Sequence, residues 1–175
     1  MDWNANRNNT MGNGMAQGNR DSIGYEEPQI TVIGKGTKIT GTMSVAGDLV
    51  IEGEIEGDIS CQNTLKINGL VNGNIETADL QLDDARIHGN VNCAGEFILN
   101  DTSLVDGDCH SATMVCGGRI KGNVDVDESA CFQERAALVG DLDAGDIEII
   151  KGAVIQGKIN IRQDVFFDDE QKGIR

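Results

Sequence analysis

The chain carries five cysteines and two histidines, the side chains best suited to metal binding or nucleophilic catalysis. It contains no Cys-x-x-Cys pair and no Cys/His spacing typical of a zinc site. His88 directly precedes a glycine, whereas His110 follows a different glycine by three residues. A free cysteine usually packs as a small hydrophobic residue. We therefore expect the cysteines in the core, both histidines on the surface, and no catalytic residues.

Acidic and glycine-rich segments are the other candidates for ligand binding. The Gly-Gly-x-Gly-x-Asp phrase of calcium-binding repeat proteins is absent from the sequence. Glycine pairs such as Gly34-Lys35-Gly36 lack the strand–turn–helix setting of a phosphate-binding loop. Acidic side chains also keep a sheet protein soluble and discourage sideways pairing of sheets. We therefore predict no metal, no nucleotide and no other cofactor.

A short phrase, aliphatic-x-Gly-x-aliphatic, returns along the chain, as in Ile55-Glu56-Gly57-Asp58-Ile59. The central glycines are Gly41, Gly57, Gly73, Gly89, Gly107, Gly122, Gly140 and Gly157. Consecutive glycines are 15 to 18 residues apart, a period that indicates a repeat architecture. Within each phrase the apolar residues are two apart, which is the strand period.

Each repeat contains further apolar positions of the same parity. Four residues after the glycines come Val45, Cys61, Thr77, Cys93, Ser111, Val126, Ala144 and Ile161. A second apolar pair follows in most copies, such as Leu65 and Ile67, whereas the copy after Gly122 offers only Cys131-Phe132. A repeat of two or three short strands cannot bury its own apolar face, but stacked copies bury one another. We predict an all-β, single-domain parallel β-helix, that is, a solenoid.

The repeated glycine has the parity of its aliphatic neighbours, so it either points inward or marks a corner. The residue after it is usually Asn or Asp, which suit turns and can form a hydrogen-bonded ladder. Cys61 and Cys93 fall two coils apart, about 9.6 Å at the usual strand spacing of about 4.8 Å. That separation is too long for a disulfide.

Composition limits the partners. The net charge of −15 argues against nucleic acid, which binds Lys/Arg-rich surfaces. No apolar run approaches the length of a spanning helix and no signal peptide is recognisable, so we expect a cytoplasmic protein. Residues 1–28 and 166–175 lack the repeat, and we expect disordered tails on either side of a domain at 29–165. Membrane association of the protein stays open.

The opening phrase Thr31-Val32-Ile33-Gly34-Lys35-Gly36, followed by the glycine-centred pentads, resembles the bactofilins, bacterial cytoskeletal proteins. The resemblance covers about residues 29–165. It implies a right-handed β-helix between disordered tails that stacks end to end into nucleotide-independent, non-polar filaments. It also implies a scaffolding role in cell shape or in positioning client proteins, and many members of the family carry a short N-terminal membrane-targeting segment.

A solenoid has two terminal coils whose backbone groups and apolar columns must be capped or paired. The apolar residues beyond the last complete pentads are Ile30, Val32, Ile33, Phe166 and Phe167. We predict that this set forms the polymerisation interface, although the two phenylalanines could instead cap their own coil. Two other functions remain open: a monomeric β-helix binding module, and an enzyme like the β-helix acyltransferases. The sequence disfavours the enzyme, because it has neither hexapeptide repeats nor a long loop.

Overall fold

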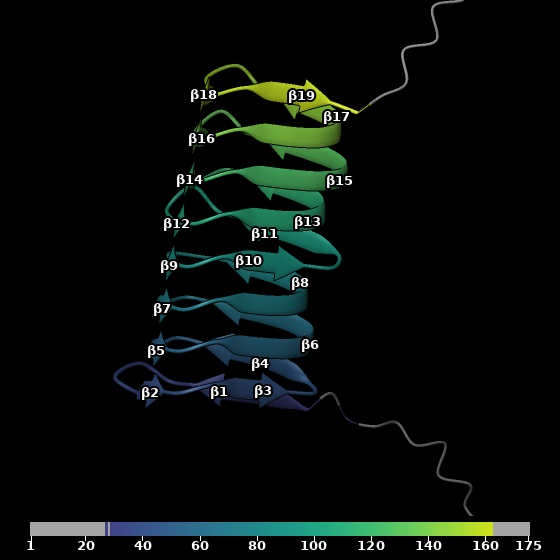
Figure 1. The fold of residues 1–175 in the computed structure, drawn as a ribbon. Coiled ribbons are helices and arrows are strands. Elements are labelled where there is room, and N and C mark those ends of the chain that lie inside the picture. The colour runs from purple at the N-terminus through teal and green to yellow at the C-terminus, as the bar shows by residue number, and fades with distance from the viewer. Residues whose placement is uncertain (1–26, 28, 163–175) are drawn as a thin grey trace, which may run out of the picture.

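A computed structural model describes residue 27 and residues 29–162, and all its secondary structure is β. Parallel strands stack into a solenoid of eight coils (Figure 1), which confirms the predicted β-helix. The proposed tails, residues 1–28 and 166–175, lie outside the described residues except for Glu27.

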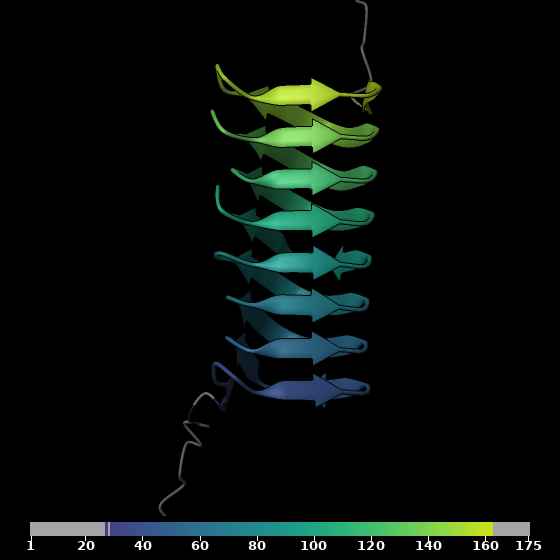
Figure 2. The same ribbon diagram turned by 90° about the vertical axis from the view of Figure 1, so that its left-hand side faces the viewer.

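The strands form two parallel sheets. The eight-stranded sheet contains β2 (Lys38–Thr40), β5 (Glu54–Glu56), β7 (Leu70–Asn72), β9 (Arg86–His88), β12 (Leu104–Asp106), β14 (Arg119–Lys121), β16 (Ala137–Val139) and β18 (Val154–Gln156). The eleven-stranded sheet contains β1 (Ile30–Ile33), β3 (Met43–Val45), β4 (Asp48–Ile51), β6 (Ile59–Ile67), β8 (Ile75–Leu82), β10 (Val91–Cys93), β11 (Glu96–Leu99), β13 (Cys109–Cys116), β15 (Val124–Phe132), β17 (Leu142–Ile149) and β19 (Ile159–Ile161). Figure 2 shows one strand of each coil, stacked in a single column.

One coil consists of a short strand of the smaller sheet, a glycine corner, and a longer path through the larger sheet. The β6–β8 pairing illustrates this path, with Ile59 opposite Ile75 and Leu65 opposite Leu80. The register shifts between Cys61 and Thr64, where the strand bends. In two coils the two halves of this path are separate strands, β3 with β4 and β10 with β11.

The core is a set of apolar columns running along the solenoid axis. In the middle coils the predicted inward positions are buried, and they include Thr77 and Ser111, which keep the interior narrow. Phe97 and Phe132 are the largest fully buried side chains. Ala130 is buried as well, so the copy after Gly122 has its second pair in Ala130 and Phe132, not in Cys131-Phe132.

The repeated glycines mark corners of the coils. Of the two settings that the sequence allowed, an inward-pointing glycine or a corner, the structure has the corner. Their φ angles lie between 123° and 155°, a region that side-chain-bearing residues rarely adopt. From Gly57 onward, a Cβ added to each of them would collide with the carbonyl oxygen of the corresponding glycine in the preceding coil. Successive backbones therefore approach at this corner more closely than any other residue would permit.

The Asn/Asp ladder predicted beside the glycines is present. The side-chain Oδ1 of Asp58 accepts a hydrogen bond from the backbone N–H of Asn74, at 3.0 Å. The same bond recurs from coil to coil up to the Oδ1 of Asp141, which accepts from the N–H of Lys158, at 3.0 Å. Each bond joins adjacent coils at the glycine corner, so the ladder fastens the backbone where the chain turns.

Candidate functional site: the two ends of the solenoid

The inward apolar columns end uncovered at the C-terminal coil. Ile149, Ile159 and Ile161 are 49%, 41% and 51% exposed. Their partners in the preceding coil, Phe132, Leu142 and Ala144, are all buried. The same column positions therefore change from core to surface only because no further coil follows among the described residues. This end presents an apolar face shaped like the interior packing of the solenoid.

The N-terminal end is partly covered. Ile39, Met43 and Val45 occupy inward positions and are half-buried, whereas their partners in the next coil are buried. On the remaining side, β1 lies beneath β4 and pairs Ile33 with Ile51. The first complete coil is therefore covered by β1 along β4, whereas its strands β2 and β3 have no strand beneath them among the described residues.

The terminal strands are sheet edges. In the described part of the chain, β2 and β18 end the smaller sheet, and β19 ends the path of the larger sheet. Parallel edge strands present backbone N–H and C=O groups that can pair with a further strand. Each end therefore combines unpaired strand edges with open apolar columns.

The residues predicted from the sequence to form the interface occupy three different settings. Ile30 and Val32 are exposed and lie in outward columns, opposite Asp48 and Val50. Ile33 is buried and belongs to the core. Phe166 and Phe167 lie outside the described residues. The predicted interface does not include Ile149, Ile159 and Ile161. Their position as the last members of inward columns could have identified them from the sequence.

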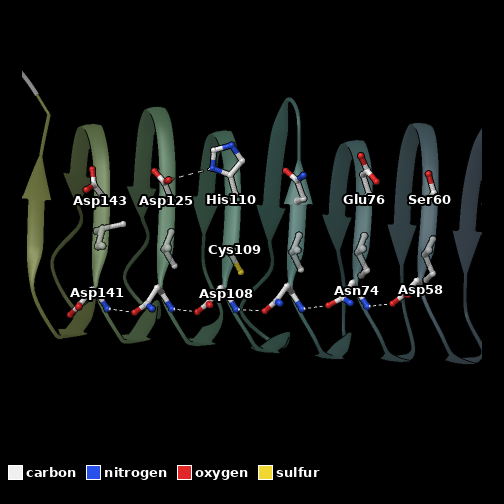
Figure 3. A pocket seen from close by; sticks show the side chains of 18 of the residues that line it. Asp58, Ser60, Asn74, Glu76, Asp108, Cys109, His110, Asp125, Asp141 and Asp143 are labelled. Carbon is white, nitrogen blue, oxygen red and sulfur yellow. Dashed lines mark hydrogen bonds and ion pairs between the residues drawn. The ribbon is translucent and has the colours of Figure 1, made fainter.

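A shallow groove of about 970 Å³ runs along one side of the solenoid. One wall is the Asn/Asp ladder, and the other is the outward column that contains Ser60, Glu76, His110, Asp125 and Asp143 (Figure 3). Both predicted surface histidines are indeed half-exposed, and they lie in different columns. The groove offers polar side chains and carboxylates, together with apolar residues such as Ile75 and Val91 at its floor.

His110 lies between two carboxylates. Its Nδ1 is 3.6 Å from Oδ2 of Asp125, and its Nε2 is 3.6 Å from Oδ2 of Asp127. Ligand atoms of these three residues lie within 4.8 Å of one another. However, the guanidinium of Arg162 already pairs with both carboxylates. The cluster is therefore an ion-pair network in which Arg162 supplies the positive charge beside Asp125 and Asp127.

The cysteines are free thiols, and four of the five are buried. Burial raises the pKa of both Cys109 and Cys116 to about 12. The exception is Cys131, whose side chain lies on the outside of β15 and is half-buried. Burial, followed by the neighbouring Glu148, raises its pKa as well.

Because the thiolate is the reactive form, we expect iodoacetamide at pH 8 to modify Cys131 first in the folded protein. Cys109 and Cys116 should react only after unfolding, since burial both shields them and keeps them protonated. Peptide mass spectrometry of native and urea-unfolded samples measures this order. Equal labelling of Cys109 and Cys131 in the native protein would contradict the assigned burial.

No helix in the described part of the chain is long and apolar enough to cross a membrane. The sequence matches the family described as Bactofilin, polymer-forming cytoskeletal, over residues 31–83 and 71–160. Neither a curated protein nor a solved structure matches the chain. The family match spans almost the whole solenoid. The chain therefore belongs to the bactofilin family of polymer-forming cytoskeletal proteins.

Proposed function

We propose that this protein assembles end to end into nucleotide-independent filaments through its terminal coils. One observation carries the proposal: Ile149, Ile159 and Ile161 continue the core columns but have no coil above them in the described structure. A second subunit stacked on this end would extend both the apolar columns and the parallel strand pairing. The family, which forms polymers, supports self-association.

Apolar burial can supply the driving force. Fully burying an isoleucine side chain contributes roughly 1.5–3 kcal/mol, so completing the burial of half-exposed isoleucines contributes roughly 1 kcal/mol each. Backbone pairing along the edge strands adds to this. Such a contact needs no nucleotide, because its energy comes from surfaces already present on the folded subunit. It should tolerate salt, since apolar burial is not screened as charge pairs are.

The filament is proposed as a cytoplasmic scaffold for cell shape or protein positioning, without a catalytic role. Its proposed partners are further copies of the chain, together with client proteins bound by the tails at residues 1–28 and 166–175. The net charge of −15 disfavours nucleic acid as a partner. A monomeric binding module is the second candidate, favoured by the groove along the side of the solenoid.

An Ile161→Asp variant should fold but fail to form filaments. Ile161 is 51% exposed in the isolated subunit, so a carboxylate there remains hydrated until a second subunit buries it. Val139→Asp is the matched control, because Val139 is 50% exposed but points outward from β16. Circular dichroism checks folding, while sedimentation and negative-stain microscopy report filaments.

End-to-end stacking predicts filaments for the wild type and for Val139→Asp, and none for Ile161→Asp. The reverse order would place the contact on the sides of the solenoid. Wild-type protein that stays monomeric at high concentration would instead support the binding module.

A further inference from the structure

Arg162 follows directly after β19, and its side chain reaches back over two coils. Its guanidinium pairs with Asp125 of β15, and its Nε lies 2.6 Å from Oδ1 of Asp143 on β17. Nη2 also donates to the carbonyl oxygen of Val126, at 3.0 Å. A weaker approach, 3.9 Å, joins Nη1 to Asp127. One cation thus links the last described coil to the two coils beneath it.

These carboxylates would repel one another without a cation. Asp125 and Asp143 are direct partners in the β15–β17 register, so their side chains stand in adjacent coils, about 4.8 Å apart in the backbone. Like charges directly opposite one another destabilise a strand pair. His110 borders Asp125 from the coil below, and Arg162 borders it from above. Arg162 is therefore placed to neutralise a stack of like charges.

Apart from Arg162, the side-chain bond that joins β19 to β17 is the one that Nδ2 of Asn160 donates to Oδ2 of Asp143, at 2.9 Å, in the described part of the chain. All three residues of β19 are exposed, and β19 pairs with β17 alone among the described strands. The pairing ends with the backbone N–H of Arg162, which donates to the carbonyl oxygen of Ala144, at 2.9 Å. Ile159 and Ile161, two of the three isoleucines of the open end, belong to this strand.

We propose that Arg162 is a positioning residue, an ionic clasp that holds β19 in the register required to receive the next subunit. This inference rests on the proposed end-to-end assembly and adds a regulatory feature to it. A single exposed ion pair contributes little to stability, but a network in which one arginine spans several carboxylates is more effective. Because the network is exposed, salt screens it. Elongation at this end should therefore combine a salt-tolerant apolar contact with a salt-sensitive clasp.

Hydrogen–deuterium exchange of the monomer tests the clasp independently of assembly. Arg162→Gln should speed exchange in β19 about threefold to tenfold, as expected for a network of this kind. High salt should produce a similar change in the wild type and little further change in the variant. Arg135→Gln is the matched control: it also removes one arginine charge, but from an exposed pair with Asp101 in which no residue of β19 takes part.

Removing the like charges should make the clasp dispensable. In an Asp125→Asn, Asp143→Asn background, Arg162→Gln should leave exchange in β19 nearly unchanged. Arg162→Lys should restore only part of the protection, because an ammonium does not reproduce the forked guanidinium contacts. The proposal would be overturned if Arg162→Gln left the exchange rate of β19 unchanged. It would also be overturned if Arg135→Gln raised that rate by the same factor.

Assembly supplies the second readout. The critical concentration of Arg162→Gln should rise about threefold or more relative to the wild type and to Arg135→Gln. Faster exchange in β19 with an unchanged critical concentration would overturn the link between the clasp and assembly. A wild type that forms no filaments would refute the proposed function. The exchange experiment would then still show whether Arg162 holds β19 in place in the monomer.

Discussion

Replacing Gly89 by alanine should destabilise the solenoid severely. Gly89 has a φ of 148°, and a Cβ there would lie closer than 3.0 Å to the carbonyl oxygen of Gly73. Forcing a non-glycine residue into a rarely populated conformation costs about 1–3 kcal/mol, and overpacking costs about 1–3 kcal/mol more. A loss of roughly 2–6 kcal/mol is a large fraction of the stability of an ordinary domain. Urea unfolding followed by circular dichroism measures it.

Gly34→Ala is the matched control for this experiment. A Cβ on Gly34 would meet no atom within 4 Å, and its φ lies outside the left-handed region. The expected change in unfolding free energy is therefore small, within about 0.5 kcal/mol. If the two alanine variants unfolded at the same urea concentration, the glycine corners would not be the close contacts between coils that we infer.

Replacing Ile75 by aspartate should have an effect of similar size, through the core instead of the corner. Ile75 is buried between Ile59 and Val91 in the neighbouring coils. The substitution removes apolar contacts and leaves an unpaired carboxylate between two aliphatic side chains, which costs roughly 3–5 kcal/mol. Thermal unfolding by circular dichroism should show a much lower midpoint or an unfolded chain.

The adjacent residue provides the comparison. Glu76 is exposed on the outer side of the same strand, so Glu76→Lys should change stability by about 0.5 kcal/mol or less. Equal destabilisation by the two substitutions would mean that the inward and outward sides of β8 are wrongly assigned.

Burial of the cysteines was only partly predictable from the sequence. Cys61, Cys93, Cys109 and Cys116 replace apolar residues in inward columns, and all four are buried. Cys131 was predicted to join them and lies on the outside instead. Its neighbour Ala130 occupies the inward position, but alanine gives too weak a hydrophobic signal to show the parity of this copy.

The sequence by itself determined the repeat and, outside the copy after Gly122, the strand parity, whereas the structure showed that the repeated glycines mark corners. These properties depend on residues within one coil: apolar residues two apart, a glycine where φ is positive, and an Asn or Asp beside it. The identity of the inward columns followed, because stacked copies bury the same positions. Family membership followed from the same local phrases.

Only the tertiary structure decided which side chains of different coils meet. The repeats differ in length, and register shifts such as the one between Val126 and Ser129 absorb the difference, so the period alone does not align outward residues. Arg162 and Asp125 are 37 residues apart, yet they form an ion pair because the last coil lies two levels above β15. Exposure of Ile161 likewise depends on where stacking stops. Contacts between coils are set by the register of the whole stack, whereas strand and corner are set by a few neighbouring residues.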